Sequence, residues 1–355
     1  MEASANQHIN MLDFLLYPFA VLYDGVTSIR NWMYDCSILQ SYTFDIPTIC
    51  IGNLAVGGTG KTPHTEYLIR LFQAKGMHVA VLSRGYKRKT KGFVLADDSS
   101  TVADIGDEPY QMFHKFQGLT VAVDADRCEG IQRLQDLDKR PDVILLDDAF
   151  QHRRVQPTVS ILLTDRHRLY STDWLMPMGR LRESRKGHRR ADIVIVTKCT
   201  ETAVNEFQKG KLHTNLKLEP QQQLYFSRIK YGKLSNGISL DQLKDYSVLL
   251  ITGIANPRPL EEELGKYTDF NSMRFGDHHN FTQADITGIR QAYEALEGSQ
   301  RLIVTTEKDY TRLAPLLHTE SLCSLPIEVE IMNGEQAEFE DRIISSITKE
   351  VKSEK

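Results

Sequence analysis

The stretch Gly57-Gly58-Thr59-Gly60-Lys61-Thr62 decides the fold of this chain of 355 residues. It follows the apolar run Ile49-Cys50-Ile51 and precedes a helix-like stretch from Thr65 to Lys75, which gives the order strand, glycine loop, helix. Glycines let backbone N–H groups converge on phosphate oxygens, and the start of a helix adds positive dipole character there. In such a loop the lysine reaches the β- and γ-phosphates, and the threonine hydroxyl binds Mg²⁺. We therefore predict a site for a nucleoside triphosphate; the alternative is a glycine turn that ends a strand.

Length and composition narrow the classes of protein that fit. A chain of this length suits two domains, and 41% hydrophobic with 25% charged residues is ordinary for a globular protein. The net charge of −4 argues against nonspecific nucleic-acid binding, so no nucleic-acid partner is expected. The cysteines are scattered singly, without a C-x-x-C pair, which predicts neither a zinc site nor a disulfide framework. The reducing cytoplasm is the simplest location for such a chain.

Short apolar strands alternate with helical patterns through the first two-thirds of the chain. Continuous Val/Ile/Leu runs are typical of strands that are buried on both faces of a parallel sheet. The expected strands are Ile46–Ile51, His78–Leu82, Thr120–Val123, Val143–Leu146, Val159–Leu163 and Ile193–Val196. The expected helices include Thr65–Lys75, Pro109–Phe116 and Arg127–Leu137. The pattern predicts an α/β fold of the P-loop NTPase type, with a mostly parallel sheet and flanking helices.

A change of composition near Pro220 indicates a second domain. A polar, hairpin-like stretch that ends near Asp245 reads as a linker, and a second, smaller α/β series follows it. We therefore expect one domain over residues 1–222, and the linker with the smaller domain over residues 223–355. The elements expected in this second series are Val248–Ile251, Pro259–Leu264, Gln283–Leu296, Leu302–Thr305 and Ile327–Ile331.

The N-terminal segment Ile9–Tyr23 is strongly apolar and contains aromatic residues. It is too short to span a bilayer, which needs about 20 apolar residues. The segment lacks a basic start and a cleavage site with small residues, which argues against a signal peptide. Two interpretations remain open: a helix that lies in a membrane interface, with Arg30 and Trp32 nearby, or a helix packed on the core of its own domain.

Acidic and basic residues follow the predicted strands where chemistry is expected. Asp147 and Asp148 end a buried strand, where a P-loop protein carries the second half of its Mg²⁺ site; a solvated acidic turn is the alternative. Two runs supply cations and hydrogen-bonding groups beyond the same edge of the sheet: Gln151-His152-Arg153-Arg154 and Gly179-Arg180-Leu181-Arg182-Glu183. Arginine forks match phosphate oxygens, but for any single arginine a solvated surface charge is the alternative.

Three further groups of residues allow more than one interpretation each. Asp107 and Glu108 would serve either as a helix cap, with a proline in the first turn, or as a general base. The run Asp277-His278-His279 is either a surface loop or a histidine biased by a neighbouring carboxylate. The basic turn Arg84–Lys89 would attract anionic lipids or substrates, or is a solvated loop.

Several motifs together resemble the tetraacyldisaccharide 4′-kinases of lipid A synthesis. The resemblance covers nearly the whole chain, and Ala55 at the first glycine position of the loop does not depart from it. The motifs are Gly52-Asn53 with Val56–Pro63, Ser83-Arg84-Gly85-Tyr86, Gly106-Asp107-Glu108-Pro109, Asp147–Arg153, Gly179-Arg180-Leu181-Arg182-Glu183, Asp277-His278-His279 and Thr305–Asp309.

The resemblance implies an ATP-dependent kinase at the cytoplasmic face of the bacterial inner membrane. The family phosphorylates the 4′-hydroxyl of an acylated glucosamine disaccharide 1-phosphate, which gives lipid IVA. The resemblance also implies a P-loop domain joined by a strand-like linker to a smaller α/β domain. It further implies an N-terminal helix, about residues 8–35, that touches the membrane surface.

The resemblance also assigns roles to residues. Asp107 would accept the proton of the sugar hydroxyl, and His278 from the other domain would orient it, so we expect closure around ATP. The residues expected around ATP are Gly57, Gly58, Thr59, Gly60, Lys61, Thr62, Asp147, Asp148, Gln151, Arg182 and Glu183. Thr62, Asp147 and Asp148 are the expected Mg²⁺ ligands.

Two other functions are weighed against this one. The first is a nucleotide switch of the GTPase or partition-ATPase kind. Val56 stands where partition ATPases carry a lysine, and the run Val196-Thr197-Lys198-Cys199 lacks the asparagine and aspartate that read guanine. The second is a soluble small-molecule kinase, in which the N-terminal apolar segment would be buried and activity would not depend on lipid.

Overall fold

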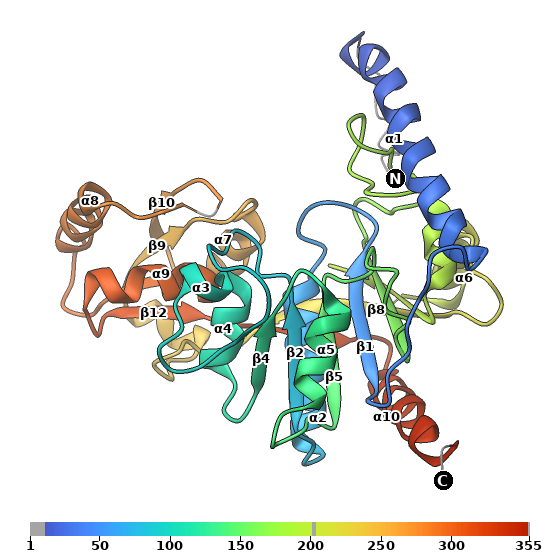
Figure 1. Cartoon of the computed structure of the whole chain (residues 1–355). Coiled ribbons are helices and arrows are strands. Elements are labelled where there is room, and N and C mark those ends of the chain that lie inside the picture. Colours follow the sequence, from blue (N-terminus) through green and yellow to red (C-terminus); the bar gives the residue numbers. More distant parts are fainter. Residues whose placement is uncertain (1–10, 201–203, 278, 354–355) are drawn as a thin grey trace. The chain divides into compact units, whose positions relative to one another are not determined.

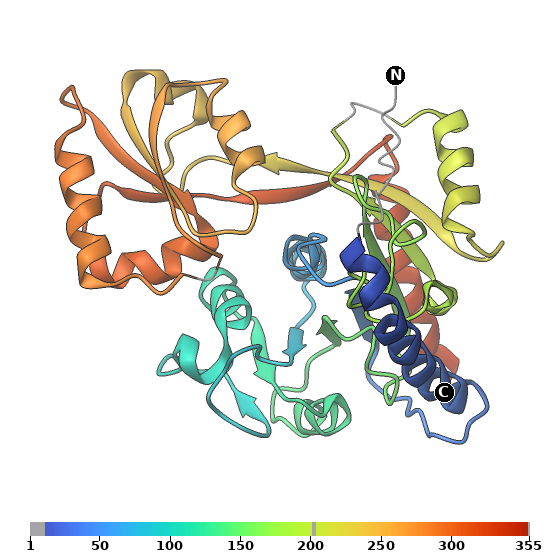
Figure 2. The same ribbon diagram turned by 90° about the horizontal axis from the view of Figure 1, so that it is seen from above.

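The computed structural model describes residues 11–200, 204–277 and 279–353, and the chain divides into two compact units. The first unit contains residues 1–228 and 330–355, and the second contains residues 229–329 (Figures 1 and 2). The expected division at residue 222 differs from this one, because the C-terminal segment belongs to the first unit. Within the described residues, no helix combines the length and the apolar character that crossing a bilayer requires.

A nine-stranded sheet forms the centre of the first unit, in the order β13-β8-β7-β6-β1-β5-β2-β4-β3. Neighbouring strands from β8 to β4 pair in parallel, and β3 pairs with β4 in the antiparallel sense. The predicted parallel α/β fold is therefore confirmed. The strands are β1 (Thr48–Asn53), β2 (Val79–Ser83), β3 (Val94–Leu95), β4 (Thr120–Val123), β5 (Val143–Asp147), β6 (Val159–Asp165), β7 (Ile193–Thr197), β8 (Gln223–Tyr231) and β13 (Ile327–Ile331).

Helices of the first unit begin where the sequence supplies caps. Asp126 accepts a hydrogen bond from the Cys128 N–H at the start of α5, and Asn205 forms a capping box with Gln208 at the start of α6. The helices are α1 (Met11–Asp35), α2 (Lys61–Ala74), α3 (Val102–Ile105), α4 (Asp107–Lys115), α5 (Arg127–Gln135), α6 (Glu206–Leu216) and α10 (Gln336–Ser353). A 3₁₀ helix covers Arg185–Arg190.

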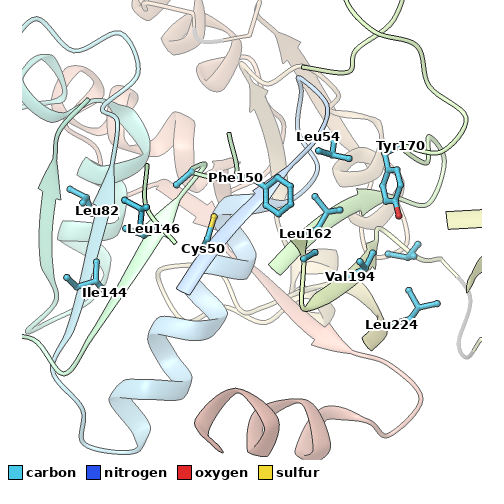
Figure 3. Packing of buried hydrophobic residues seen from close by; sticks show 14 of the residues in the cluster. Cys50, Leu54, Leu82, Ile144, Leu146, Phe150, Leu162, Tyr170, Val194 and Leu224 are labelled. Atoms are coloured by element: carbon cyan, nitrogen blue, oxygen red, sulfur yellow. The ribbon is translucent and has the colours of Figure 1, made fainter. Parts of the chain in front are cut away.

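The core of the first unit explains why its strands are continuous apolar runs. Ile144 and Leu146 of β5 lie in one cluster with Leu82 and Val194 (Figure 3). Val143 and Leu145, which alternate with them along β5, are also fully buried. Successive side chains of a strand point to opposite faces, so both faces of this sheet are covered. Full burial of one such aliphatic side chain contributes roughly 1.5–3 kcal/mol.

The second unit is built on a four-stranded parallel sheet, in the order β10-β9-β11-β12. Its strands are β9 (Ser247–Thr252), β10 (Phe270–Arg274), β11 (Arg301–Thr306) and β12 (Leu322–Leu325). Its helices are α7 (Arg258–Leu264), α8 (Gln283–Glu294) and α9 (Glu307–Leu317). Thr282 and Asp285 form a capping box at the start of α8.

Two predictions about the boundaries of the second series, one before it and one at its end, need correction. The segment expected as a polar linker contains β8, because Leu224, Tyr225 and Phe226 are buried in the large sheet. The strand Ile327–Ile331 exists with the predicted bounds, yet it is β13 at the edge of the large sheet and does not belong to the small one. Sequence spacing alone does not show that the chain returns to its first sheet.

His64 links the glycine-loop helix α2 to strand β8 in the first unit. Its Nδ1 lies 2.6 Å from the Gly60 carbonyl oxygen and its Nε2 lies 2.9 Å from the Ser227 hydroxyl. A carbonyl only accepts, so Nδ1–H donates to Gly60 and Nε2 accepts from the serine. Burial lowers the pKa of His64 to about 4, against the opposing effect of the Gly60 hydrogen bond. The ring is therefore neutral in the folded protein at ordinary pH.

We predict that His64 makes the folded protein less stable as pH falls from about 6.5 towards 4. The unfolded ring takes up a proton below its ordinary pKa of 6.5, whereas the folded ring does so only near pH 4. From pH 7.5 to pH 5 the expected loss is about 2 kcal/mol. Chemical unfolding at the two pH values measures it. A smaller pH slope is expected for His64→Asn but not for His167→Asn at an exposed position; equal slopes in all three proteins would contradict the prediction.

Candidate active site

The register of two neighbouring strands brings the two predicted halves of a nucleotide site together. β1 and β5 pair in parallel, with Ile51 opposite Asp147. Both strands therefore end at the same edge of the sheet. The glycine loop leaves β1 at that edge, and the acidic pair leaves β5 there, as the sequence predicts.

The glycine loop is held from both sides and leaves its tip exposed. The Val56 N–H donates to the Arg180 carbonyl at 2.8 Å, and Nδ2 of Asn53 donates to the Thr59 hydroxyl at 2.7 Å. The Thr197 hydroxyl donates to the Thr59 carbonyl at 2.9 Å. Gly60 has φ of 91° directly before α2, a left-handed conformation that favours glycine. The loop thus has the local geometry of a phosphate cradle.

Asp147 is buried at the end of β5, with only 1% of its surface exposed. The Thr65 hydroxyl of α2 donates to its Oδ1 at 3.3 Å. Burial, followed by the charges of Glu108 and Asp148, raises its pKa to about 7, while Lys61 and Arg127 act in the opposite direction. Negative charge is therefore concentrated at this point, which is the electrostatic setting that a divalent cation stabilises.

Asp148 leaves the strand in a left-handed conformation, with φ of 47°. Aspartate tolerates this region better than most residues do. The turn directs its carboxylate towards two cations: Nζ of Lys61 lies 3.8 Å from Oδ1, and Nη1 of Arg182 lies 3.0 Å from both oxygens. The structure thus joins the loop lysine, the acidic pair and Arg182 at one edge.

Gln151 and Glu183 lie in a partly buried network beside the glycine loop, in which Glu183 itself is buried. Nε2 of Gln151 donates to the Asn53 carbonyl at 2.8 Å and to Oε1 of Glu183 at 3.0 Å. Arg190 donates to both oxygens of Glu183, at 2.8 and 2.9 Å, and Nδ2 of Asn31 donates to Oε2 at 2.7 Å. Both oxygens of Glu183 are therefore used within the protein, where the residue organises the loops that carry the site.

Asp107 begins α4 in the same unit. The cap position is Gly106, with φ of 91°, so a glycine and not a carboxylate stands at the cap. A Cβ at Gly106 would lie 3.0 Å from the Tyr86 carbonyl, which explains why two glycine-containing motifs, Ser83–Tyr86 and Gly106–Pro109, approach so closely. Glu108 is near enough to raise the pKa of Asp147. The expected partner of Asp107, His278, lies outside the described residues.

The residues on either side of His278, Asp277 and His279, make contacts within the second unit. Nζ of Lys308 lies 3.8 Å from Oδ1 of Asp277. Nε2 of His279 lies 3.0 Å from Oδ2 of Asp285, the residue that completes the cap of α8. The His279 ring also stacks on Phe275 at 4.9 Å between centroids. His279 therefore contributes to the structure of this loop.

Arg127 is a buried cation at this edge that the sequence analysis did not select. Its Nη1 donates to the Asp124 carbonyl at 2.7 Å and its Nη2 to the Asp147 carbonyl at 3.5 Å. Only 2% of its surface is exposed, and its charge lowers the pKa of Asp147. The signal was its position four residues after β4, beyond the carboxyl end of a buried strand.

One other cluster of potential metal ligands occurs among the described residues: Asp126, Cys128 and His152, whose ligand atoms lie within 4.8 Å of one another. Nη1 of Arg154 lies 2.5 Å from Oδ2 of Asp126 and already supplies a positive charge there. Asp126 also caps α5. The edge that carries Asp147 and Asp148 is therefore the better candidate for a cation.

Comparison with known proteins identifies relatives over the whole chain. Residues 12–348 match the family model described as tetraacyldisaccharide-1-P 4′-kinase. A tetraacyldisaccharide 4′-kinase of Bacteroides thetaiotaomicron is 48% identical in sequence. That match covers 96% of this chain and 95% of the relative. One from Parabacteroides distasonis is 49% identical, with 98% of both chains covered.

A solved structure agrees with these relatives. It is LpxK from Aquifex aeolicus, described as an apo form in complex with ATP, with a TM-score of 0.74 and 28% sequence identity. The match covers 95% of this chain and 100% of the other.

We predict that Glu183→Gln destabilises the first unit by about 3 kcal/mol, because it leaves the Arg190 charge without its buried partner. Chemical unfolding measures the change. Glu219→Gln is the matched control, since it breaks the neighbouring Arg189–Glu219 pair, whose arginine side chain is 62% exposed. Exposed pairs contribute little, so its effect should stay below about 1 kcal/mol. Equal losses in the two variants would show that Glu183 does not organise the site.

Proposed function

This chain belongs to the tetraacyldisaccharide-1-P 4′-kinase family, and on that premise we propose that it reacts at the carboxyl edge of the nine-stranded sheet. The chain is an ATP-dependent phosphotransferase that phosphorylates the 4′-hydroxyl of a tetraacyl disaccharide 1-phosphate in lipid A synthesis. One observation carries the location of the reaction: the Lys61 amine lies 3.8 Å from the Asp148 carboxylate where β1 and β5 end together.

The loop residues supply the charge and donors that a triphosphate needs. Gly57, Gly58, Thr59 and Gly60 present backbone N–H groups, and Lys61 places a cation beside the phosphates. Phosphoryl transfer spreads negative charge over oxygens, so positioning and electrostatic stabilisation account for most of the catalysis. Arg182, with its side chain held by Asp148 and Gln151, is the further cation available to these oxygens.

Mg²⁺ fits the residues at this edge. Three carboxylates interact there electrostatically, and burial together with the charges of Glu108 and Asp148 raises the pKa of Asp147. Thr62, together with Asp147 or Asp148, would hold the ion, which would neutralise charge on the phosphate oxygens. The Thr65 hydroxyl orients Asp147 from the opposite side.

Asp107 is the proposed general base for the sugar hydroxyl, and His278 is its proposed partner. A carboxylate that accepts the proton of the hydroxyl makes the oxygen a better nucleophile as the γ-phosphoryl group is transferred. A histidine that is hydrogen-bonded to that carboxylate orients it and adjusts its proton affinity. The location of Asp107 in the first turn of α4 keeps it near the motifs of the same sheet edge.

We propose that α1 brings this site to the cytoplasmic surface of the inner membrane. Acyl chains leave the bilayer only at a large cost in hydrophobic free energy, so the acceptor is best taken from the lipid surface. An apolar stripe of α1 is exposed: Leu15, Phe19, Leu22, Val26 and Ile29, each with more than half of its surface accessible. A stripe of this kind on a helix with nearby cations suits the interfacial region of a membrane.

We predict that Asp107→Ala and His278→Ala each lower turnover by about 10²–10⁴-fold, because general-base catalysis contributes that much. The two losses should not add, since the residues act as one unit. The assay measures transfer of the γ-phosphate from ATP to the tetraacyl disaccharide 1-phosphate, and calorimetry measures ATP affinity, which should be largely kept. Asp98→Ala and His167→Ala, at exposed positions, are the controls. Turnover near the wild-type value in either of the first two variants would refute the pair.

We predict that Leu22→Glu/Val26→Glu weakens binding to anionic liposomes, because two carboxylates interrupt the apolar stripe. Co-sedimentation with the vesicles measures the effect, and removal of residues 1–24 should act in the same direction. Phe207→Glu is the matched control, since Phe207 lies on α6 and is 81% exposed. Full co-sedimentation of the α1 variants would contradict the membrane role of the helix.

A further inference from the structure

We propose that Tyr23 and Asn31 of α1 are positioning residues, which set the Arg182–Glu183 segment at the phosphate-binding edge. The inference rests on the proposed function and adds a second role to the helix. Through these two residues, the helix that carries the exposed apolar stripe is hydrogen-bonded to the segment that faces Asp148. The packing of α1 on the body of the first unit would then also position the residues of the reaction centre.

The two faces of α1 differ in what they contact. The apolar stripe defined above repeats at intervals of three and four residues, which places it on one side of the helix. Ala20, which is 7% exposed, Tyr23 and Asn31 lie on another side and meet the body of the first unit. Within that unit, Figures 1 and 2 show α1 as the dark blue helix at residues 11–35.

Tyr23 fixes the backbone of Arg182. Its hydroxyl donates to the Arg182 carbonyl at 2.7 Å, and the Arg182 N–H donates to the Leu54 carbonyl at 2.7 Å. The residue is therefore held between α1 on one side and the incoming strand of the glycine loop on the other. The guanidinium of Arg182 donates from this fixed backbone to Asp148. Loss of the tyrosine hydroxyl would release one of the two backbone contacts that aim this cation.

Asn31 fixes the side chain of Glu183. Its amide donates to Oε2 at 2.7 Å, while Gln151 donates to Oε1 at 3.0 Å. The same Gln151 amide also donates to the Asn53 carbonyl, at the end of β1. A third residue of α1, Arg30, donates to the Gln151 carbonyl at 3.0 Å. Asn31 is thus connected, through one carboxylate and one amide, to the start of the glycine loop.

A further contact ties α1 to the loop that follows the acidic pair. Nη1 of Arg153 donates to the Asn31 carbonyl at 2.7 Å and lies 2.8 Å from Oδ1 of Asp35. The guanidinium groups of Arg30 and Arg153 both lie over the Tyr34 ring, 5.4 and 5.2 Å from its centre. α1 therefore contacts both loops that carry site residues, so a shift of the helix would disturb both.

The test uses the full-length protein with Tyr23→Phe and Asn31→Leu, which remove the donors and leave the apolar stripe intact. We expect kcat to fall by about 3–10-fold in each variant, the usual effect of one lost hydrogen bond near a reacting centre. ATP affinity by calorimetry and co-sedimentation with liposomes should match the wild type. Wild-type kcat in both variants would overturn the inference.

A positioning role predicts a second result that a purely structural role does not. In an Arg182→Ala background, Tyr23→Phe should have no further effect on kcat, because the cation that it aims is absent. Independent losses that multiply would show that Tyr23 does not act through Arg182, and would overturn the inference. Tyr17→Phe, which removes a hydroxyl from a side chain that is 53% exposed on the same helix, should keep wild-type kcat.

An acceptor with short acyl chains separates positioning from lipid binding. With this dissolved substrate, lipid contact no longer limits the reaction, and Tyr23→Phe should still be slower than the wild-type protein. Wild-type kcat of Tyr23→Phe with this substrate would assign its effect to lipid contact and overturn the inference. Absence of transfer by the wild-type protein would instead refute the proposed function on which the inference rests.

Discussion

Burying Asp147 at the end of β5 is unfavourable, and only the cations around it offset part of that cost. Glu108 and Asp148 add negative charge to the same place and raise its pKa further. Lys61 and Arg127 oppose them, and Arg182 binds Asp148. A concentration of negative charge of this kind is unfavourable, and a bound cation would offset it. The parallel register of β1 and β5 makes the arrangement possible, because it fixes the glycine loop beside the acids.

The central sheet could be predicted from the sequence because its strands are buried on both faces and read as unbroken apolar runs. β4 and β13 have the predicted bounds, and β5 and β7 each extend one residue further. The glycine loop and Asp148 were predictable for a related reason, since chemistry gathers where such strands end. The contacts of Asn31 with Glu183 and of His64 with Ser227 were not, since they join residues more than 150 positions apart. Local patterns carry no information about such pairs.

The N-terminal helix is a second case in which a local sequence pattern did not predict the tertiary contacts. Its apolar character left two interpretations open, a membrane interface or the core of its own domain. The structure gives α1 both kinds of surface: Ala20 is buried, while Phe19 and Leu22, on either side in sequence, are largely exposed. A substrate with acyl chains at one end and a reactive sugar hydroxyl at the other presents the same division. In α1 the apolar face is exposed, and the other face is hydrogen-bonded to the Arg182–Glu183 segment of the site.

The route of the chain has a consequence for biosynthesis. β8 leads out of the first unit and β13 leads back into it, so the second unit is an insertion within the first. A ribosome therefore releases every residue of the inserted unit before it releases α10, whose Phe339 packs on Tyr225 of β8. The smaller unit is able to fold during translation, but the nucleotide-binding unit acquires β13 and α10 only after the whole smaller unit has been synthesised. Nascent chains thus carry the glycine loop on an unfinished sheet throughout synthesis of the smaller unit.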